Sequence, residues 1–199
     1  MQITSLSEMQ IFQEFPIALK GTKTAEEIYQ SVGKALTHWE ILEDSMAVLF
    51  NKLSRPQSLS SVSQRIYLSE TAPSSRRKLI KTAASAYFEF FENRELELKT
   101  NEIIKIYESG SNRRNEIAHG FVAGHINPNK EGFSGYYLGP HFNSIRKRDR
   151  KFRPKYLITN NEIEIFVNDS NSIRGQVNEI QYEIVENWRK SPEARRERY

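Results

Sequence analysis

The chain has 199 residues and a mass of 23.2 kDa, which suggests one principal domain. Hydrophobic residues make up 38% of it and charged residues 27%, and this composition can form one core and argues against global disorder. Cysteine is absent, which excludes a disulfide framework, a thiolate nucleophile and a zinc site built from cysteine. The net charge of +4 permits an anionic partner.

Residues 1–21 do not have the pattern of a signal peptide, because they carry Glu8 and Glu14 and no long apolar run. No stretch approaches the ~18 consecutive apolar residues that a membrane span needs. We therefore expect a soluble, cytoplasmic protein that does not associate with membranes.

The first strong periodic pattern covers residues 24–53. Thr24 and Glu27 have the spacing of a capping box, and apolar residues then recur at steps of three and four. This predicts an amphipathic helix that ends before Pro56. The apolar stripe consists of Ile28, Val32, Ala35, Leu36, Trp39, Leu42, Met46, Leu49, Phe50 and Leu53.

Two more long helices follow a connection at residues 54–73, which is rich in Ser and Gln and is expected to hold a short helix around 62–68. The second long helix is predicted to begin at Ser74 or Ser75, and the third near Thr100. Gly110 is expected to weaken the third helix, and Gly120 suits its C-terminal end. The apolar positions of the second helix are Leu79, Ala83, Ala86, Tyr87, Phe90 and Phe91.

Residues 121–158 have a different composition, with several glycines and aromatic residues, and predict loops with short strands at 121–126 and 134–139. The last helix is expected after Thr159 and Asn160. The fold class is therefore all-α, an antiparallel helical bundle of four to five helices with a small β/loop insertion before the last helix. The expected divisions are an N-terminal extension (1–23), a helical domain (24–190, with the insertion at 121–158) and a charged tail (191–199).

The most informative motif is R-N-E-I-A-H-G at residues 114–120, at the end of the third long helix. In this motif the sequence resembles the HEPN superfamily, whose hallmark is an arginine, often followed by a polar residue, and a histidine four to six residues after it. The long first helix with Trp39, Leu42 and Glu43, and the closing helix introduced by residues 156–163, extend the resemblance. It implies a small helical bundle, usually a homodimer, and in many members a metal-independent ribonuclease without a cofactor.

The resemblance assigns roles to three residues. Arg114 would bind and stabilise the phosphate, because a guanidinium is a permanently charged fork of donors. His119 would move the proton, since imidazole titrates near neutral pH. Asn115 would orient the imidazole or bind the substrate. On an ideal helix Arg114 and His119 point ~140° apart, so we expect either a helix end before His119 or a two-fold dimer that combines two copies of the motif.

A basic run near the insertion is a second candidate for contact with RNA. These residues could form an exposed charged loop without a ligand. Alternatively, the loop could lie along an RNA backbone, with its positive charges near the phosphates and Phe152 stacked on a base. Arg113 is a further RNA-binding candidate, or else a solvated charge. The run consists of Arg146, Lys147, Arg148, Arg150, Lys151, Arg153 and Lys155.

The sequence thus predicts an endoribonuclease that cleaves single-stranded RNA by 2′-OH attack, in the setting of a prokaryotic toxin or anti-phage defence system with a neutralising or defence partner protein. The alternatives are a non-catalytic RNA- or protein-binding module and a scaffold of a defence complex. Some HEPN toxins carry a modifiable tyrosine at the position of Phe121, so that regulation is not expected here. Glu43 is a candidate partner for Arg114, and Glu40 is expected to be a surface charge.

Overall fold

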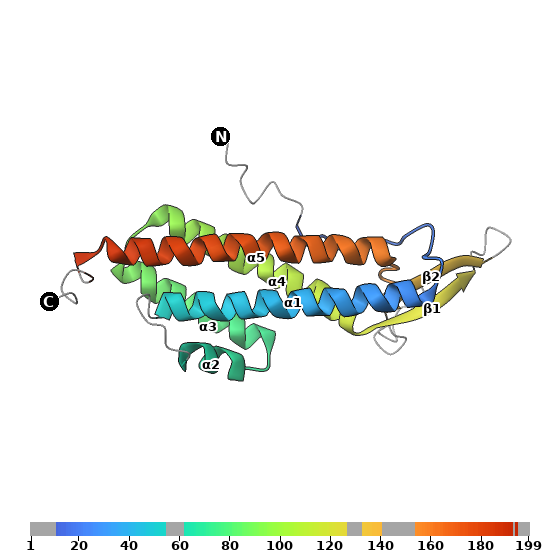
Figure 1. The fold of residues 1–199 in the computed structure, drawn as a ribbon, viewed down its shortest axis with the longest axis horizontal. Coiled ribbons are helices and arrows are strands. Elements are labelled where there is room, and N and C mark those ends of the chain that lie inside the picture. The colour runs from blue at the N-terminus through green and yellow to red at the C-terminus, as the bar shows by residue number, and fades with distance from the viewer. Residues whose placement is uncertain (1–10, 55–61, 127–132, 141–153, 193, 195–199) are drawn as a thin grey trace. The chain divides into compact units, whose positions relative to one another are not determined.

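The computed structural model describes residues 11–54, 62–126, 133–140, 154–192 and 194. In this part of the chain, five helices and one two-stranded antiparallel sheet form, which confirms the mainly α-helical class with a small sheet before the last helix (Figure 1). The elements are α1 (Ala25–Ser54), α2 (Val62–Ser69), α3 (Pro73–Phe90), α4 (Arg94–Ala118), β1 (Gly120–Ile126), β2 (Phe133–Pro140) and α5 (Asn160–Arg189).

The chain forms two compact units. Of the described residues, unit 1 comprises those within 41–108 and 171–194, and unit 2 comprises those within 11–40 and 109–170. α1, α4 and α5 each contribute one part to unit 1 and the other part to unit 2. None of the described helices is long and apolar enough to cross a membrane.

Most of the stripe predicted for α1 is buried, with Trp39 in unit 2 and Leu42 in unit 1, but α3 buries a partly different set of residues. Ile80, Ala84 and Phe88 of α3 are buried, whereas Phe90, which the sequence placed in the core stripe, is 73% exposed. Tyr87 of the predicted stripe is buried, while most of its other members lie on a neighbouring face; with Phe50 and Leu53 they line an open groove of about 690 Å³. Both stripes are apolar, so hydrophobic spacing alone did not distinguish them.

α4 begins before the expected start near Thr100 and runs through Gly110 without interruption. The side chain of Asn93 caps its N-terminus by accepting a hydrogen bond from the backbone N–H of Leu96 at 3.1 Å. A methyl group at Gly110 would lie 2.7 Å from the ring of Phe12 and 2.8 Å from the ring of Trp39. The glycine therefore permits close packing in unit 2 and does not break the helix.

Three aromatic rings form the centre of unit 2. The ring of Phe12 packs edge-on against Trp39, with centroids 6.1 Å apart, and lies 5.3 Å from Phe166, while Trp39 stacks on Phe166. Phe12 is 5% exposed, and its backbone N–H donates to Asp169 at 2.8 Å. Residues 11–23, expected to be an extension, thus contribute to the core of this unit.

The β1–β2 hairpin lies beside the starts of two helices in unit 2. Thr22, shortly before α1, pairs with Tyr136 of β2, and Ile158, shortly before α5, pairs with Leu138. Since both helices begin at the hairpin, α1 and α5 run in parallel here, as the contacts Lys34–Glu164 and Trp39–Phe166 show. This pair departs from the antiparallel arrangement that we expected.

The start of α5 follows the prediction closely. The side chain of Glu162 accepts hydrogen bonds from the backbone N–H of Thr159 at 2.7 Å and from its hydroxyl at 2.5 Å. The same hydroxyl oxygen accepts from the backbone N–H of Asn161 at 3.2 Å. These contacts cap the first turn, where an acidic side chain also interacts favourably with the helix dipole.

Candidate functional site at the end of α4

The motif at residues 114–120 lies in unit 2, where α4 ends and β1 begins. The last residue of α4 is Ala118, and the backbone N–H of His119 still donates to the carbonyl of Asn115 at 3.0 Å. His119 therefore closes the last helical turn, and the next residue, Gly120, starts the strand. The helix end that the sequence predicted at Gly120 is confirmed.

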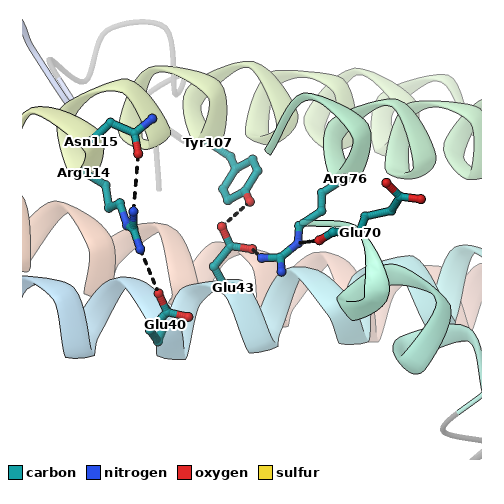
Figure 2. Close-up of polar contacts among 7 residues, drawn as sticks. All are labelled: Glu40, Glu43, Glu70, Arg76, Tyr107, Arg114 and Asn115. Carbon is teal, nitrogen blue, oxygen red and sulfur yellow. Dashed lines mark hydrogen bonds and ion pairs between the residues drawn. The ribbon is translucent and has the colours of Figure 1, made fainter. Parts of the chain in front are cut away.

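The guanidinium of Arg114 makes two long polar contacts (Figure 2). Nη1 donates to Oδ1 of Asn115 and Nη2 donates to a carboxylate oxygen of Glu40 on α1, both at 3.4 Å. Nε is buried and has no hydrogen-bond partner among the described residues. Bonds of this length are weak and arginine carries five N–H donors, so the side chain, 31% exposed, retains donors for an anion such as a phosphate.

Asn115 contacts the arginine with its side chain and the histidine with its backbone. Its Oδ1 accepts from Arg114, and its carbonyl accepts from the N–H of His119. We expected the Asn115 side chain to orient the imidazole of His119, but no hydrogen bond between these two side chains occurs among the described residues. In this arrangement the Asn115 side chain makes a weak contact with the guanidinium.

His119 is exposed at the tip of the helix, where a titratable imidazole is accessible to a ligand. Because its N–H completes the α-helical hydrogen-bond pattern, its Cα occupies a nearly helical position, and the divergence of ~140° from Arg114 is retained. One copy of the chain therefore presents the two side chains on different sides of α4.

Gly120 fixes the junction between α4 and the hairpin. A Cβ atom at this position would lie 2.6 Å from Cγ of Leu138 and 3.0 Å from the carbonyl oxygen of Glu116. Leu138 is buried and bonded to Ile158 through both backbone groups, at 2.8 and 2.9 Å. The close packing thus positions His119 relative to the hairpin, which gives the glycine of the motif a structural reason.

Arg113 is not the solvated charge that we considered. It is 8% exposed, its Nη1 lies 2.7 Å from a carboxylate oxygen of Glu116, and its guanidinium lies 5.6 Å from the ring centroid of Phe15. These contacts hold Arg113 inside unit 2, where an ion pair and a cation–π contact compensate for its burial. Contact with RNA through Arg113 stays a prediction, and the geometry favours a structural role.

The carboxylate that contacts Arg114 is not the one that the sequence suggested. Glu40, expected to be a surface charge, makes the contact, whereas Glu43 belongs to a buried network of unit 1 (Figure 2). There Glu43 accepts a hydrogen bond from the hydroxyl of Tyr107 at 2.5 Å and pairs with Arg76 at 2.8 Å. The contact of Glu43 with Arg114 stays a prediction.

Tyr156 is a residue of the site region to which sequence reasoning gave no role. Its hydroxyl donates to the carbonyl oxygen of Glu116 on α4 at 2.9 Å, and its ring packs near Phe15. Burial, with a smaller effect from the Glu116 carboxylate, raises the pKa of Tyr156 to about 12. A tyrosine just before a predicted helix gives no sequence signal for such a contact.

Most of the basic run lies outside the described residues, namely Arg146, Lys147, Arg148, Arg150, Lys151 and Arg153. Its last member, Lys155, is described and lies 3.5 Å from the carboxylate of Glu116. No group of three potential metal ligands occurs within the described part of the chain. His141 and the side chain of His125 lie outside this part.

Comparison with known proteins gave no assignment. No protein-family model matches the chain, and no curated protein or solved structure matches it significantly.

Proposed function

We propose that the protein is a metal-independent endoribonuclease of the HEPN type that acts on single-stranded RNA as a homodimer. The observation that carries the proposal is the end of α4, where an exposed histidine follows a partly exposed arginine whose two polar contacts are both 3.4 Å long. Its biological setting, by the resemblance of the motif, is a toxin or an anti-phage defence effector of a prokaryote.

Each side chain suits one requirement of the reaction. Arg114 retains N–H donors that fit the oxygens of a phosphate, and its positive charge opposes the negative charge of the pentacoordinate intermediate. His119 is accessible and accepts the proton of the ribose 2′-OH as this oxygen attacks phosphorus. The bond from phosphorus to the 5′-oxygen then breaks, and an imidazolium donates the proton that the leaving oxygen takes up. The products are a 2′,3′-cyclic phosphate and a 5′-hydroxyl.

The divergence of Arg114 and His119 on α4 supports a dimeric enzyme. In a two-fold dimer the same surface of each copy faces the other, so two arginines and two histidines meet in one cleft. One His119 then acts as the base and the other as the acid, which a single imidazole would do only in succession. The proposal therefore includes the surface through which the two copies pair, which must contain the end of α4.

The test compares the wild type with His119→Ala on mixed single-stranded RNA in the presence of EDTA. We expect cleavage by the wild type, with 2′,3′-cyclic phosphate ends, and a loss of at least about 100-fold in the variant. His38→Ala on α1 is the matched control, because it makes the same chemical change outside the motif and should retain activity. Since His119 is exposed, its replacement should leave the thermal unfolding midpoint unchanged.

Equal cleavage by the wild type and His119→Ala would refute the assignment of the site. Intact RNA with the wild type, together with measurable RNA binding, would favour the alternative of a non-catalytic binding module. The use of EDTA also separates this reaction from nucleases that depend on a divalent metal.

A further inference from the structure

α3 has a second apolar face that is not buried in unit 1. Leu79 and Ala83 are partly exposed, Ala86 is exposed and Phe90 is 73% exposed. These four residues follow one another at steps of four, three and four, so they form one stripe about 60° wide around the helix axis. They line the groove of about 690 Å³ in unit 1 together with side chains from the end of α1. An apolar stripe of this kind is typical of a helix that packs against another helix.

The sizes of the side chains along this stripe are symmetric about its midpoint. Two large residues, Leu79 and Phe90, lie at the ends, and two alanines, Ala83 and Ala86, lie on either side of the centre. When a second α3 lies antiparallel to the first, Leu79 of each copy meets Phe90 of the other, and Ala83 meets Ala86. The small residues at the centre let the two helix axes approach to about 8 Å. The stripe therefore fits a second copy of itself.

The charges beside the stripe are complementary in the same way. Lys78 and Glu89 are both exposed, and neither forms an ion pair with another residue in the described part of the chain. They are eleven residues apart, so they lie within about 20° of each other around the helix, on the flank of the stripe that faces away from the buried side of α3. At 1.5 Å per residue, Lys78 lies about 10 Å from the midpoint in one direction and Glu89 about 7 Å in the other. In an antiparallel pair, Lys78 of each copy is then level with Glu89 of the other to within about 3 Å along the axis.

We propose that two copies of the chain associate through this face of α3, with the two helices antiparallel and related by a two-fold axis. In such a contact each interaction occurs twice, so two Leu79–Phe90 contacts and two Lys78–Glu89 ion pairs form. A partner of another sequence would have to match both the order of side-chain sizes and the order of charges, which a second copy does by symmetry. The surface belongs to unit 1 and is distinct from the end of α4, so the inference does not rest on the proposed ribonuclease reaction.

The experiment reverses one charge of the proposed ion pair at a time. Sedimentation velocity at about 1 to 100 µM compares the wild type, Lys78→Glu and Glu89→Lys, each alone, with an equimolar mixture of the two variants. Lys81→Glu is the matched control, because it makes the same change at an exposed position about 160° around α3 from Leu79. All of these substitutions are on the surface, so the thermal unfolding midpoint should stay unchanged, which is measured for each variant.

We expect Lys78→Glu and Glu89→Lys each to raise the Kd of self-association about ten-fold or more, because each change turns two attractions into two repulsions. The two variants should associate with each other about as tightly as the wild type does with itself. In the mixed pair, a glutamate at position 78 faces a lysine at position 89, and the original pair faces it in the reverse sense, so opposite charges meet at both places. Lys81→Glu should associate as the wild type does.

Three results would overturn the pairing through α3. A wild type that stays monomeric at about 100 µM has no such contact. If Lys78→Glu weakens association no more than Lys81→Glu does, the copies associate through another surface, such as the end of α4. If the mixture of Lys78→Glu and Glu89→Lys does not recover the association, the two residues do not face each other. The proposed function is tested separately, through the cleavage of RNA by the wild type and His119→Ala.

Discussion

The guanidinium of Arg114 on α4 lies 3.4 Å from the carboxylate of Glu40 on α1, and both side chains reach solvent. Exposed ion pairs of this kind contribute little to stability, typically between 0 and about 1 kcal/mol. The contact therefore holds the arginine weakly. A phosphate that approaches Arg114 competes with the Glu40 carboxylate for the same donors.

Glu40→Gln should increase the affinity for RNA. The amide oxygen of glutamine still accepts a hydrogen bond from Arg114, so its position is retained, but the negative charge near the phosphate is removed. We expect KM for single-stranded RNA to fall by up to about five-fold, which corresponds to the largest usual value of a surface pair. The rate constant kcat should change little.

Glu26→Gln is the control for this prediction, because it removes the same charge from an exposed position in the first turn of α1. An unchanged KM in that variant would show that net charge alone is not responsible. A rise in KM for Glu40→Gln would contradict the competition and would mean that the carboxylate is needed to position Arg114.

Gly110→Ala should destabilise the protein, although alanine is the better helix former by about 1 kcal/mol. The added methyl group would lie within 2.8 Å of the rings of Phe12 and Trp39, so the aromatic core of unit 2 must move. We expect a net loss of about 1–2 kcal/mol in the free energy of unfolding, measured by urea denaturation.

Gly175→Ala in α5 is the matched control, since nothing lies within 4 Å of a Cβ at that position. It should stabilise the protein by about 0.5–1 kcal/mol. A shift of both variants in the same direction would contradict the close packing at Gly110.

The same glycine illustrates how far the sequence could predict the fold. Hydrophobic spacing identified the long helices, and the glycine- and aromatic-rich composition identified short strands at residues 121–126 and 134–139, because these patterns are local. The role of Gly110 depends on Phe12, which is distant in sequence and lies in a segment without a periodic pattern. Sequence reasoning therefore assigned the glycine a weakening effect that its neighbours remove.

The candidate site shows the same limit for charged residues. The order of Arg114, Asn115 and His119 was readable, and so was the end of the helix. Arg113 is buried and Arg114 is not, because Arg113 lies on the face of α4 that meets Phe15. Likewise, the rotation of α1 about its axis decides which of its glutamates reaches Arg114. Neither rotation is encoded in a short motif, so the burial of Arg113 and the contact between Glu40 and Arg114 were not predicted.

Loss of Glu43 should destabilise the protein strongly. Glu43 is 5% exposed and accepts hydrogen bonds from Tyr107 and Arg76 within unit 1, and Arg76 also lies 5.6 Å from the ring centroid of Tyr67. Glu43→Ala leaves the arginine without this carboxylate in a largely buried position, which typically costs about 3–5 kcal/mol. Tyr107→Phe removes the hydrogen bond to Glu43 and should cost about 1–3 kcal/mol.

Glu97→Ala serves as the control in chemical denaturation, because Glu97 pairs at 2.8 Å with the exposed Arg94. Its effect should stay below about 1 kcal/mol. If Glu43→Ala were no more harmful than this variant, the buried network would not contribute to stability as its geometry indicates.

Stability should also fall at alkaline pH, and Tyr156 allows the cause to be tested. Burial raises its pKa from 10.0 to about 12, so the folded protein holds this proton more tightly than the unfolded chain does. The resulting stabilisation is fully present below pH 10 and is lost as the pH rises from 10 to 12. At about 1.4 kcal/mol per pH unit, the loss from this residue is at most about 3 kcal/mol.

Tyr156→Phe should separate this effect from other alkaline titrations, including those of Tyr67, Tyr87 and Tyr107, whose pKa values burial also raises. The variant loses the hydrogen bond to the Glu116 carbonyl, which costs about 1 kcal/mol near neutral pH. Between pH 10 and 12 its free energy of unfolding should then decline less steeply than that of the wild type. Equal slopes in urea denaturation across this range would mean that the folded protein does not retain the Tyr156 proton.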